Sequence, residues 1–193
     1  MRSRRAEAER RYARGDLTGT LRVLCSLLAD QPDDAETWSD LAAVYFDLGA
    51  NECSRKCCVS ALALDPDYEP ARQNLRLLCQ AQGRNPRALV ERASALGRDR
   101  SALRAAAVEV LFREGCFEGA ARLADRWTEE APNCGRAWND AAVIAHRLGR
   151  HERAVACIRE AARLAPDDPR VAGNRNLIDS GTPSGTRAGA KRA

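Results

Sequence analysis

The chain has 193 residues, of which 45% are apolar and 30% are charged, and its formal net charge is +4. This length suits one compact domain or one short array of repeats, and no stretch approaches the roughly 18 uninterrupted apolar residues of a membrane span. The charged first residues lack the apolar segment of a secretory signal, so we expect a cytoplasmic protein that has no contact with membranes.

The basic charge is concentrated at the two ends of the sequence. Residues 1–14 carry six Arg and two Glu, a net +4, and residues 180–193 carry two Arg and one Lys, a net +3. Taken from the total of +4, these segments leave −3 for the body between them. A nucleic-acid-binding domain is expected to carry a basic stripe on its folded body, so this distribution disfavours nucleic acid as a partner.

Prolines and glycines recur along the chain at a spacing of 34 residues. The prolines that follow this spacing are Pro32 and Pro66, and then Pro132 and Pro166. The glycines that follow it are Gly15, Gly49 and Gly83, and then Gly115 and Gly149. One interval is shorter, because Gly83 and Gly115 are 32 residues apart. A fixed period of this length indicates a repeat architecture. It predicts five units, at 1–34, 35–68, 69–100, 101–134 and 135–168.

Each unit is predicted to form two helices joined by a tight turn. The first helix of unit 1–34 is polar, which suits a solvent-facing N-terminal cap. In 35–68, Trp38, Leu41 and Tyr45 fall on one face of a helix. This helix ends at Gly49, since glycine readily takes the left-handed conformation. A second helix runs to an Asp-Pro pair, because the residue before proline is pushed out of the helical conformation. One hairpin cannot bury its own apolar faces, so neighbouring units must stack.

The third unit is the shortest, and the chain ends differently from its repeats. The second helix of that unit is expected to begin at Asn85-Pro86, with Asn85 as its cap and Pro86 in its first turn. It is expected to stop at Gly97 without a terminal proline, so we place the missing two residues at 97–100. Beyond the fifth unit, 169–180 predict a single helix that caps the last apolar face. Residues 181–193 hold too little apolar surface to fold and predict a disordered tail.

A 34-residue helix–turn–helix unit with this pattern resembles the tetratricopeptide repeat (TPR). Two units carry most of its characteristic residues: Trp38, Leu41, Tyr45, Ala61 and Pro66 in the second, and Trp138, Ala154, Ala161 and Pro166 in the fifth. The fourth unit departs from the pattern, with Trp127 where a small residue is usual. The resemblance implies an all-α, right-handed superhelical solenoid of about five hairpins with a C-terminal capping helix.

By the same resemblance, one face of the first helices lines a concave groove that holds a peptide or helix of another protein. The residues at these repeat positions are Ser39, Ala43, Phe46, Asp47, Gln73, Leu77, Gln80, Glu109, Phe112, Arg113, Asn139, Val143, His146 and Arg147. Three of them, Phe46, Leu77 and Phe112, predict an amphipathic partner segment. Some family members hold the C-terminal carboxylates of chaperones in a clamp of Lys, Asn and Arg. The corresponding positions here do not match that clamp and hold Arg5, Glu9, Asp40, Pro70 and Asn74.

No group of residues in the sequence predicts catalysis, a cofactor or a metal site. There is no P-loop, no dinucleotide-binding glycine motif and no nucleophile elbow, and His146 and His151 are the only histidines. The sharpest cluster is CSRKCC at 53–58, but zinc needs four ligands, usually in Cys-x-x-Cys pairs, and that spacing is absent. We expect the eight cysteines to be free thiols, with those at core positions acting as small apolar residues.

The sequence therefore predicts a non-catalytic protein-binding module, an adaptor or an assembly scaffold. The alternative is an accessory subunit that recruits substrates to a separate enzyme such as a glycosyltransferase, because such repeats often accompany catalytic domains. Copurification of an enzymatic activity with the chain would favour the alternative.

Overall fold

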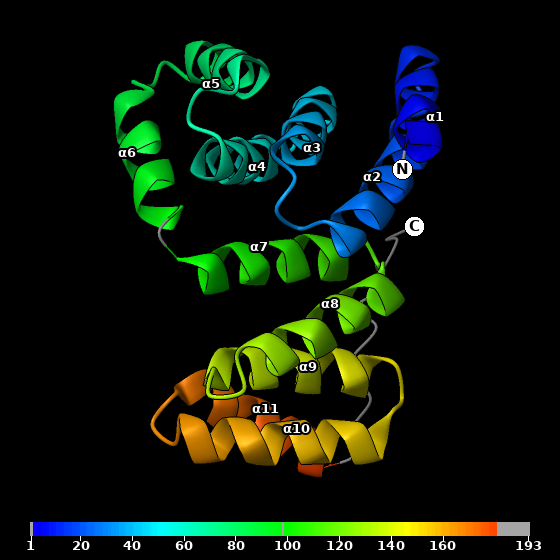
Figure 1. The fold of residues 1–193 in the computed structure, drawn as a ribbon, viewed down its shortest axis with the longest axis vertical. Coiled ribbons are helices and arrows are strands. Elements are labelled where there is room, and N and C mark those ends of the chain that lie inside the picture. The colour runs from blue at the N-terminus through cyan, green and yellow to red at the C-terminus, as the bar shows by residue number, and fades with distance from the viewer. Residues whose placement is uncertain (1, 98, 181–193) are drawn as a thin grey trace, which may run out of the picture. The chain divides into compact units, whose positions relative to one another are not determined.

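The structure, a computed structural model, describes residues 2–97 and 99–180 (Figure 1). These residues form α-helices joined by short turns, and the described part of the chain contains no strand. It divides between Gly119 and Ala120 into two compact units, here called the N-terminal and C-terminal units. The all-α class predicted from the sequence is confirmed, whereas the tail predicted at 181–193 lies outside the described residues.

The helices follow one another as successive hairpins. Those of the N-terminal unit are α1 (Arg2–Ala13), α2 (Leu17–Asp30), α3 (Ala35–Asp47), α4 (Asn51–Leu64), α5 (Glu69–Ala81), α6 (Arg87–Leu96) and α7 (Arg100–Arg113). The unit boundary falls inside α8 (Phe117–Glu130). Those that follow in the C-terminal unit are α9 (Gly135–Arg147), α10 (His151–Leu164) and α11 (Pro169–Asp179).

Aspartate side chains cap the N-termini of four helices. Asp16, Asp34 and Asp99 each accept a hydrogen bond from the backbone N–H three residues further on, at 2.9, 3.3 and 3.0 Å. Asp168 accepts one from the N–H two residues further on, at 2.9 Å. Each bond satisfies a backbone donor that has no partner within the first turn of its helix, so these residues define where α2, α3, α7 and α11 begin.

The turns between helices repeat one backbone conformation. The five glycines from Gly15 to Gly149 that set the period all have positive φ, between 61° and 76°. A Cβ atom added at any of the five would find no atom within 4 Å. The glycines are therefore required by the left-handed backbone and not by lack of space.

We expect Gly149→Ala to lower the free energy of unfolding by about 1–2 kcal/mol, the cost of a left-handed conformation for a residue with a Cβ. Gly173→Ala is the matched control, because Gly173 lies inside helix α11 and also has no atom within 4 Å of an added Cβ. That change should stabilise the protein by roughly 0.5–1 kcal/mol. Urea denaturation followed by circular dichroism measures both, and shifts of the same sign would contradict the argument.

Two tryptophans anchor corresponding helices, one in each unit. Trp38 begins the buried face of α3 and is fully buried, and its indole N–H donates to the Pro32 carbonyl at 2.8 Å. In the C-terminal unit Trp138 donates to the Pro132 carbonyl at the same distance, although this indole is only half-buried. Each indole therefore ties the start of a first helix to the turn that precedes it.

A polar contact recurs between consecutive first helices at a sequence spacing of 35 residues. In the N-terminal unit Arg5 of α1 binds Asp40 of α3 at 3.0 Å, and Asn74 of α5 donates to the Ser39 carbonyl at 3.1 Å. In the C-terminal unit Asn174 of α11 donates to the side-chain oxygen of Asn139 on α9 at 2.9 Å. The same pair of repeat positions therefore joins one hairpin to the next, with different chemistry each time.

The regular packing order changes after α5, where the shortened third unit lies. Helix α6 packs against α4, and α7 packs against α2 and α6 (Figure 1). The approach of α6 to α4 is close, because a Cβ added at Gly97 would lie 2.3 Å from the Ala63 carbonyl oxygen. Both α2 and α6 are second helices of their hairpins. Helix α7 therefore lies against second helices, where uniform stacking would have placed it beside α5.

Candidate protein-binding surface

The first helices α1, α3 and α5 of the N-terminal unit present one common face. Helix α5 packs beside α3, and the hydroxyl of Tyr12 on α1 donates to a carboxylate oxygen of Asp47 on α3 at 2.5 Å. We call this surface the α1–α3–α5 face and define it by Glu9, Tyr12, Asp40, Ala43, Phe46, Asp47, Gln73, Leu77 and Gln80. Tyr12 and Leu77 are 41% and 47% exposed, so large apolar side chains lie open on it.

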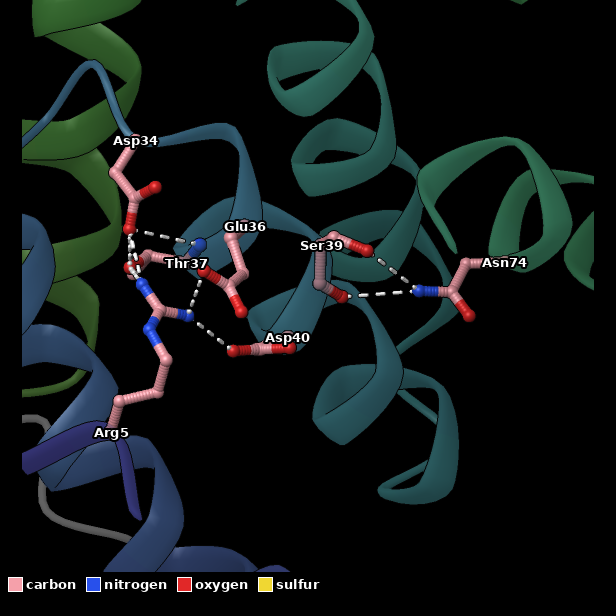
Figure 2. A network of polar contacts seen from close by, with 7 residues as sticks. All are labelled: Arg5, Asp34, Glu36, Thr37, Ser39, Asp40 and Asn74. Atoms are coloured by element: carbon pink, nitrogen blue, oxygen red, sulfur yellow. Dashed lines mark hydrogen bonds and ion pairs between the residues drawn. The ribbon is translucent and has the colours of Figure 1, made fainter. Parts of the chain in front are cut away.

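One end of this face is held together by Arg5. Figure 2 shows its guanidinium among three carboxylates, with Asp34 at 2.5 Å, Asp40 at 3.0 Å and Glu36 at 3.2 Å. The Arg5 side chain is only 20% exposed. The guanidinium of Arg5 therefore pairs with three carboxylates, and this cluster carries more negative than positive charge.

A small hollow opens beside this cluster, between α1, α2 and α3. Its volume is about 80 Å³, and it is lined by Ala8, Glu9, Tyr12, Thr20, Leu24, Asp40, Ala43 and Val44. The aliphatic side chains come from all three helices, whereas the two carboxylates come from the first helices α1 and α3. The hollow therefore combines an apolar lining with acidic groups.

The surroundings of the hollow alter the acidity of two of its lining groups. Partial burial raises the pKa of the Asp40 carboxyl to about 6, an effect that nearby Glu36, Asp34 and Glu9 reinforce and Arg5 opposes. The hydrogen bond to Asp47 raises the pKa of Tyr12 to about 12. The Asp40 side chain is 42% exposed and binds Arg5 at 3.0 Å, and a further cation would favour its charged form.

The groove residues predicted on α3 and α5 have two different surroundings. Ala43 and Phe46 are half-buried. Four further residues are exposed: Asp47, Gln73, Leu77 and Gln80. Ser39 is buried, at 2% exposure, and its carbonyl and hydroxyl oxygens both accept hydrogen bonds from Asn74. Ser39 therefore contributes to packing between hairpins, whereas the others are available on the α1–α3–α5 face.

The predicted groove residues on α7 lie elsewhere in the same unit. Glu109 pairs with Lys56 of α4 at 2.7 Å, and Arg113 donates to the Cys53 sulfur of α4 at 2.6 Å and to Glu109 at 2.8 Å. Phe112 stacks edge-on against Phe117, with ring centroids 5.1 Å apart. These residues therefore face a second helix, and the structure does not bring them to Ala43 and Leu77. The reason is the altered course of α6 and α7.

The four groove residues predicted on α9 belong to the C-terminal unit. Asn139 is buried, at 7% exposure, and its side chain bonds to Asn174 and to Asp140. Val143, His146 and Arg147 are half-buried. Asn139 occupies the same repeat position as Ser39, and like Ser39 it contacts the next first helix.

No disulfide joins the cysteines of the described residues. Cys57 and Cys58 are fully buried, and the described residues contain no group of three or more side chains suited to hold a metal ion. Sequence reasoning missed a thiol pair between α2 and the turn after α7, in which Cys25 forms a hydrogen bond with Cys116. Because the two cysteines are distant in sequence, no local pattern could have indicated their contact.

We expect Cys116 to be alkylated at unusually low pH. The hydrogen bond from Cys25 lowers the pKa of the Cys116 thiol to about 7, below the ordinary value of about 8.5, and the thiolate is the reactive form. The iodoacetamide reaction, followed by peptide mass spectrometry across pH, should show a lower midpoint for Cys116 than for an ordinary cysteine. Cys25→Ala should move the midpoint upward, whereas Cys58→Ala should not, and an unchanged midpoint in Cys25→Ala would contradict the assignment.

Comparison with known proteins gives one family match. Residues 135–168 match the family model described as tetratricopeptide repeat. Among solved structures, the chain is similar to a crystal structure of MamA protein, with 18% identity, a TM-score of 0.38, and coverage of 82% of this chain and 88% of that chain. No curated protein matches the chain.

Within the described residues, none of the helices has the length and apolar character needed to cross a membrane. The family match falls on α9 and α10, a helical hairpin closed by Gly149 in the left-handed conformation. The same hairpin turn recurs in the preceding part of the chain. Residues 135–168 therefore form a tetratricopeptide repeat.

Proposed function

We propose that this protein is a non-catalytic binding module, acting as an adaptor or assembly scaffold, that captures a peptide or helix of another protein on its α1–α3–α5 face. Tetratricopeptide repeats generally mediate contacts between proteins, and their fold is typically an interaction module without catalytic activity. The proposal rests above all on the open apolar side chains of this face, since exposed apolar patches rimmed by polar residues mark interaction sites.

The arrangement of this face suits an elongated ligand. Tyr12, Ala43 and Leu77 come from three successive first helices, so a bound segment would cross the helices in turn and contact an apolar group on each. Helix-in-groove and extended-peptide recognition both use apolar anchors spaced in this way. The polar side chains between them, Gln73 and Gln80, can form hydrogen bonds with the ligand backbone.

Leu77 and Val90 provide a matched test, because both are 47% exposed and only Leu77 lies on the α1–α3–α5 face. Affinity capture from the native host with wild type, Leu77→Ser and Val90→Ser should recover proteins that Leu77→Ser loses and Val90→Ser retains. Quantitative mass spectrometry of the captured proteins gives the comparison, and circular dichroism checks that both variants fold. Equal recovery by the two variants would count against this face as the binding surface.

A further inference from the structure

We infer that the hollow between α1, α2 and α3 receives a basic side chain, lysine or arginine, from an amphipathic segment of the protein partner. This inference rests on the proposed function, since it names the chemistry of the segment that the α1–α3–α5 face would bind. It differs from the sequence-based expectation, which required only an amphipathic ligand.

The apolar lining of the hollow matches the aliphatic stem of such a side chain. Tyr12 and Ala43 are the apolar lining residues that remain accessible to a bound side chain, whereas Ala8, Leu24 and Val44 form a buried floor. Lysine and arginine commonly lay their methylene groups along apolar surface while the charged end reaches a polar site. A space of about 80 Å³ suits part of one side chain and is too small for a helix or an aromatic pair.

The charges around the hollow complement a cation. Glu9 and Asp40 line it directly, and Asp47 adjoins it through its hydrogen bond with Tyr12. The guanidinium of Arg5 is shared among Asp34, Glu36 and Asp40. These five carboxylates exceed the guanidinium of Arg5. Helix α1 carries further arginines, of which Arg4 pairs with Asp30 and Arg11 pairs with Glu7 and Asp16. Potentials of opposite sign at the hollow would favour docking of a positive segment.

Asp40 is the carboxylate for which a second cation would matter most. Its pKa is raised to about 6, mainly because partial burial removes solvent from the charged form. An ammonium or guanidinium entering the hollow would replace that lost solvation with a charge-assisted hydrogen bond. Glu9, which is exposed on α1, lies on the same hollow and can bind the same cation.

The test uses two fluorescein-labelled synthetic peptides that differ only in charge. One is an amphipathic twelve-residue sequence of leucine, alanine and lysine, and the other has glutamate at every lysine position. Fluorescence anisotropy with the full chain should show binding of the lysine peptide and not of the glutamate peptide. Preferential binding of the glutamate peptide would overturn the inference.

The decisive comparison is between two double variants that each remove two negative charges. Glu9→Gln/Asp40→Asn alters the hollow, whereas Glu152→Gln/Asp167→Asn alters two exposed carboxylates of the C-terminal unit. Non-specific attraction falls equally in both because their net charges are equal. We expect the dissociation constant of the lysine peptide to rise about tenfold or more in the first variant only, since removing partners of a close charge pair weakens binding strongly.

Ala43→Arg gives a second, independent measurement, because it fills the hollow with a guanidinium of the protein itself. It should abolish binding of the lysine peptide while thermal unfolding confirms a folded chain. Equal affinity in both double variants, or full affinity in Ala43→Arg, would overturn the basic-segment inference. Those results would leave the Leu77 and Val90 comparison unaffected, so a failure here is separable from a failure of the proposed binding face.

Discussion

Trp38→Ala should lower the free energy of unfolding by about 3–5 kcal/mol, the usual cost of removing a large buried aromatic side chain. The Trp38 side chain is fully buried, and its loss also leaves the buried Pro32 carbonyl without its donor. Trp38→Phe should cost less, because it keeps most of the apolar contact and loses chiefly the hydrogen bond. Urea denaturation followed by circular dichroism measures both changes.

Trp138→Ala is the matched comparison for this prediction. Trp138 makes the same hydrogen bond, to the Pro132 carbonyl at 2.8 Å, but its indole is half-buried and Pro132 is exposed. Burial of less apolar surface contributes less stability, and an exposed carbonyl can be hydrated. We therefore expect a clearly smaller loss. Equal losses at the two positions would show that burial of the indole does not determine the difference.

The second large effect is expected at the close approach of α6 to α4. Gly97→Ala should destabilise the N-terminal unit by about 1–3 kcal/mol, the range for overpacking, because its Cβ would lie 2.3 Å from the Ala63 carbonyl oxygen. Backbone strain does not contribute, since Gly97 has a φ of −62°. The effect is therefore steric, unlike that at Gly149.

Hydrogen exchange locates this effect. Amides of α6 should exchange faster in Gly97→Ala, because the helix must move away from α4 to accommodate the methyl group. Ser94→Ala, at an exposed position of the same helix, should leave the exchange rates nearly unchanged, as exposed substitutions usually do. Unaltered exchange in Gly97→Ala would mean that the contact between α6 and α4 is not maintained in solution.

Local sequence signals account for the helices and turns. The period of the glycines predicts the turns, because a turn of this kind needs a residue in the left-handed conformation. Gly49 and Gly149 have that conformation. The course of α7 could not be predicted in this way. Its contacts join residues far apart in the chain, such as the Tyr45 hydroxyl and Glu114 at 2.8 Å, and they depend on how α6 turns after the shortened unit.

The binding face could be predicted only in part. Family positions identified Ala43 and Leu77, which lie on the open face, but they also identified Ser39 and Asn139, which are buried against the next first helix. The sequence does contain a signal that Ser39 and Asn139 are buried between hairpins. A polar residue occurs 35 positions after each of them, and this spacing brings the two side chains together between neighbouring hairpins. Glu9 is different, because the hollow that it lines depends on three helices at once.

The polar pairs between first helices also have a consequence for the order of the hairpins. Arg5 with Asp40 is ionic, Ser39 with Asn74 joins a hydroxyl and a carbonyl to an amide, and Asn139 with Asn174 joins two amides. If hairpins were exchanged so that Arg5 faced an asparagine, the buried side of the contact would lack its counter-charge. Each hairpin therefore accepts its own successor best, and these polar contacts help to specify the order in which the repeats are joined.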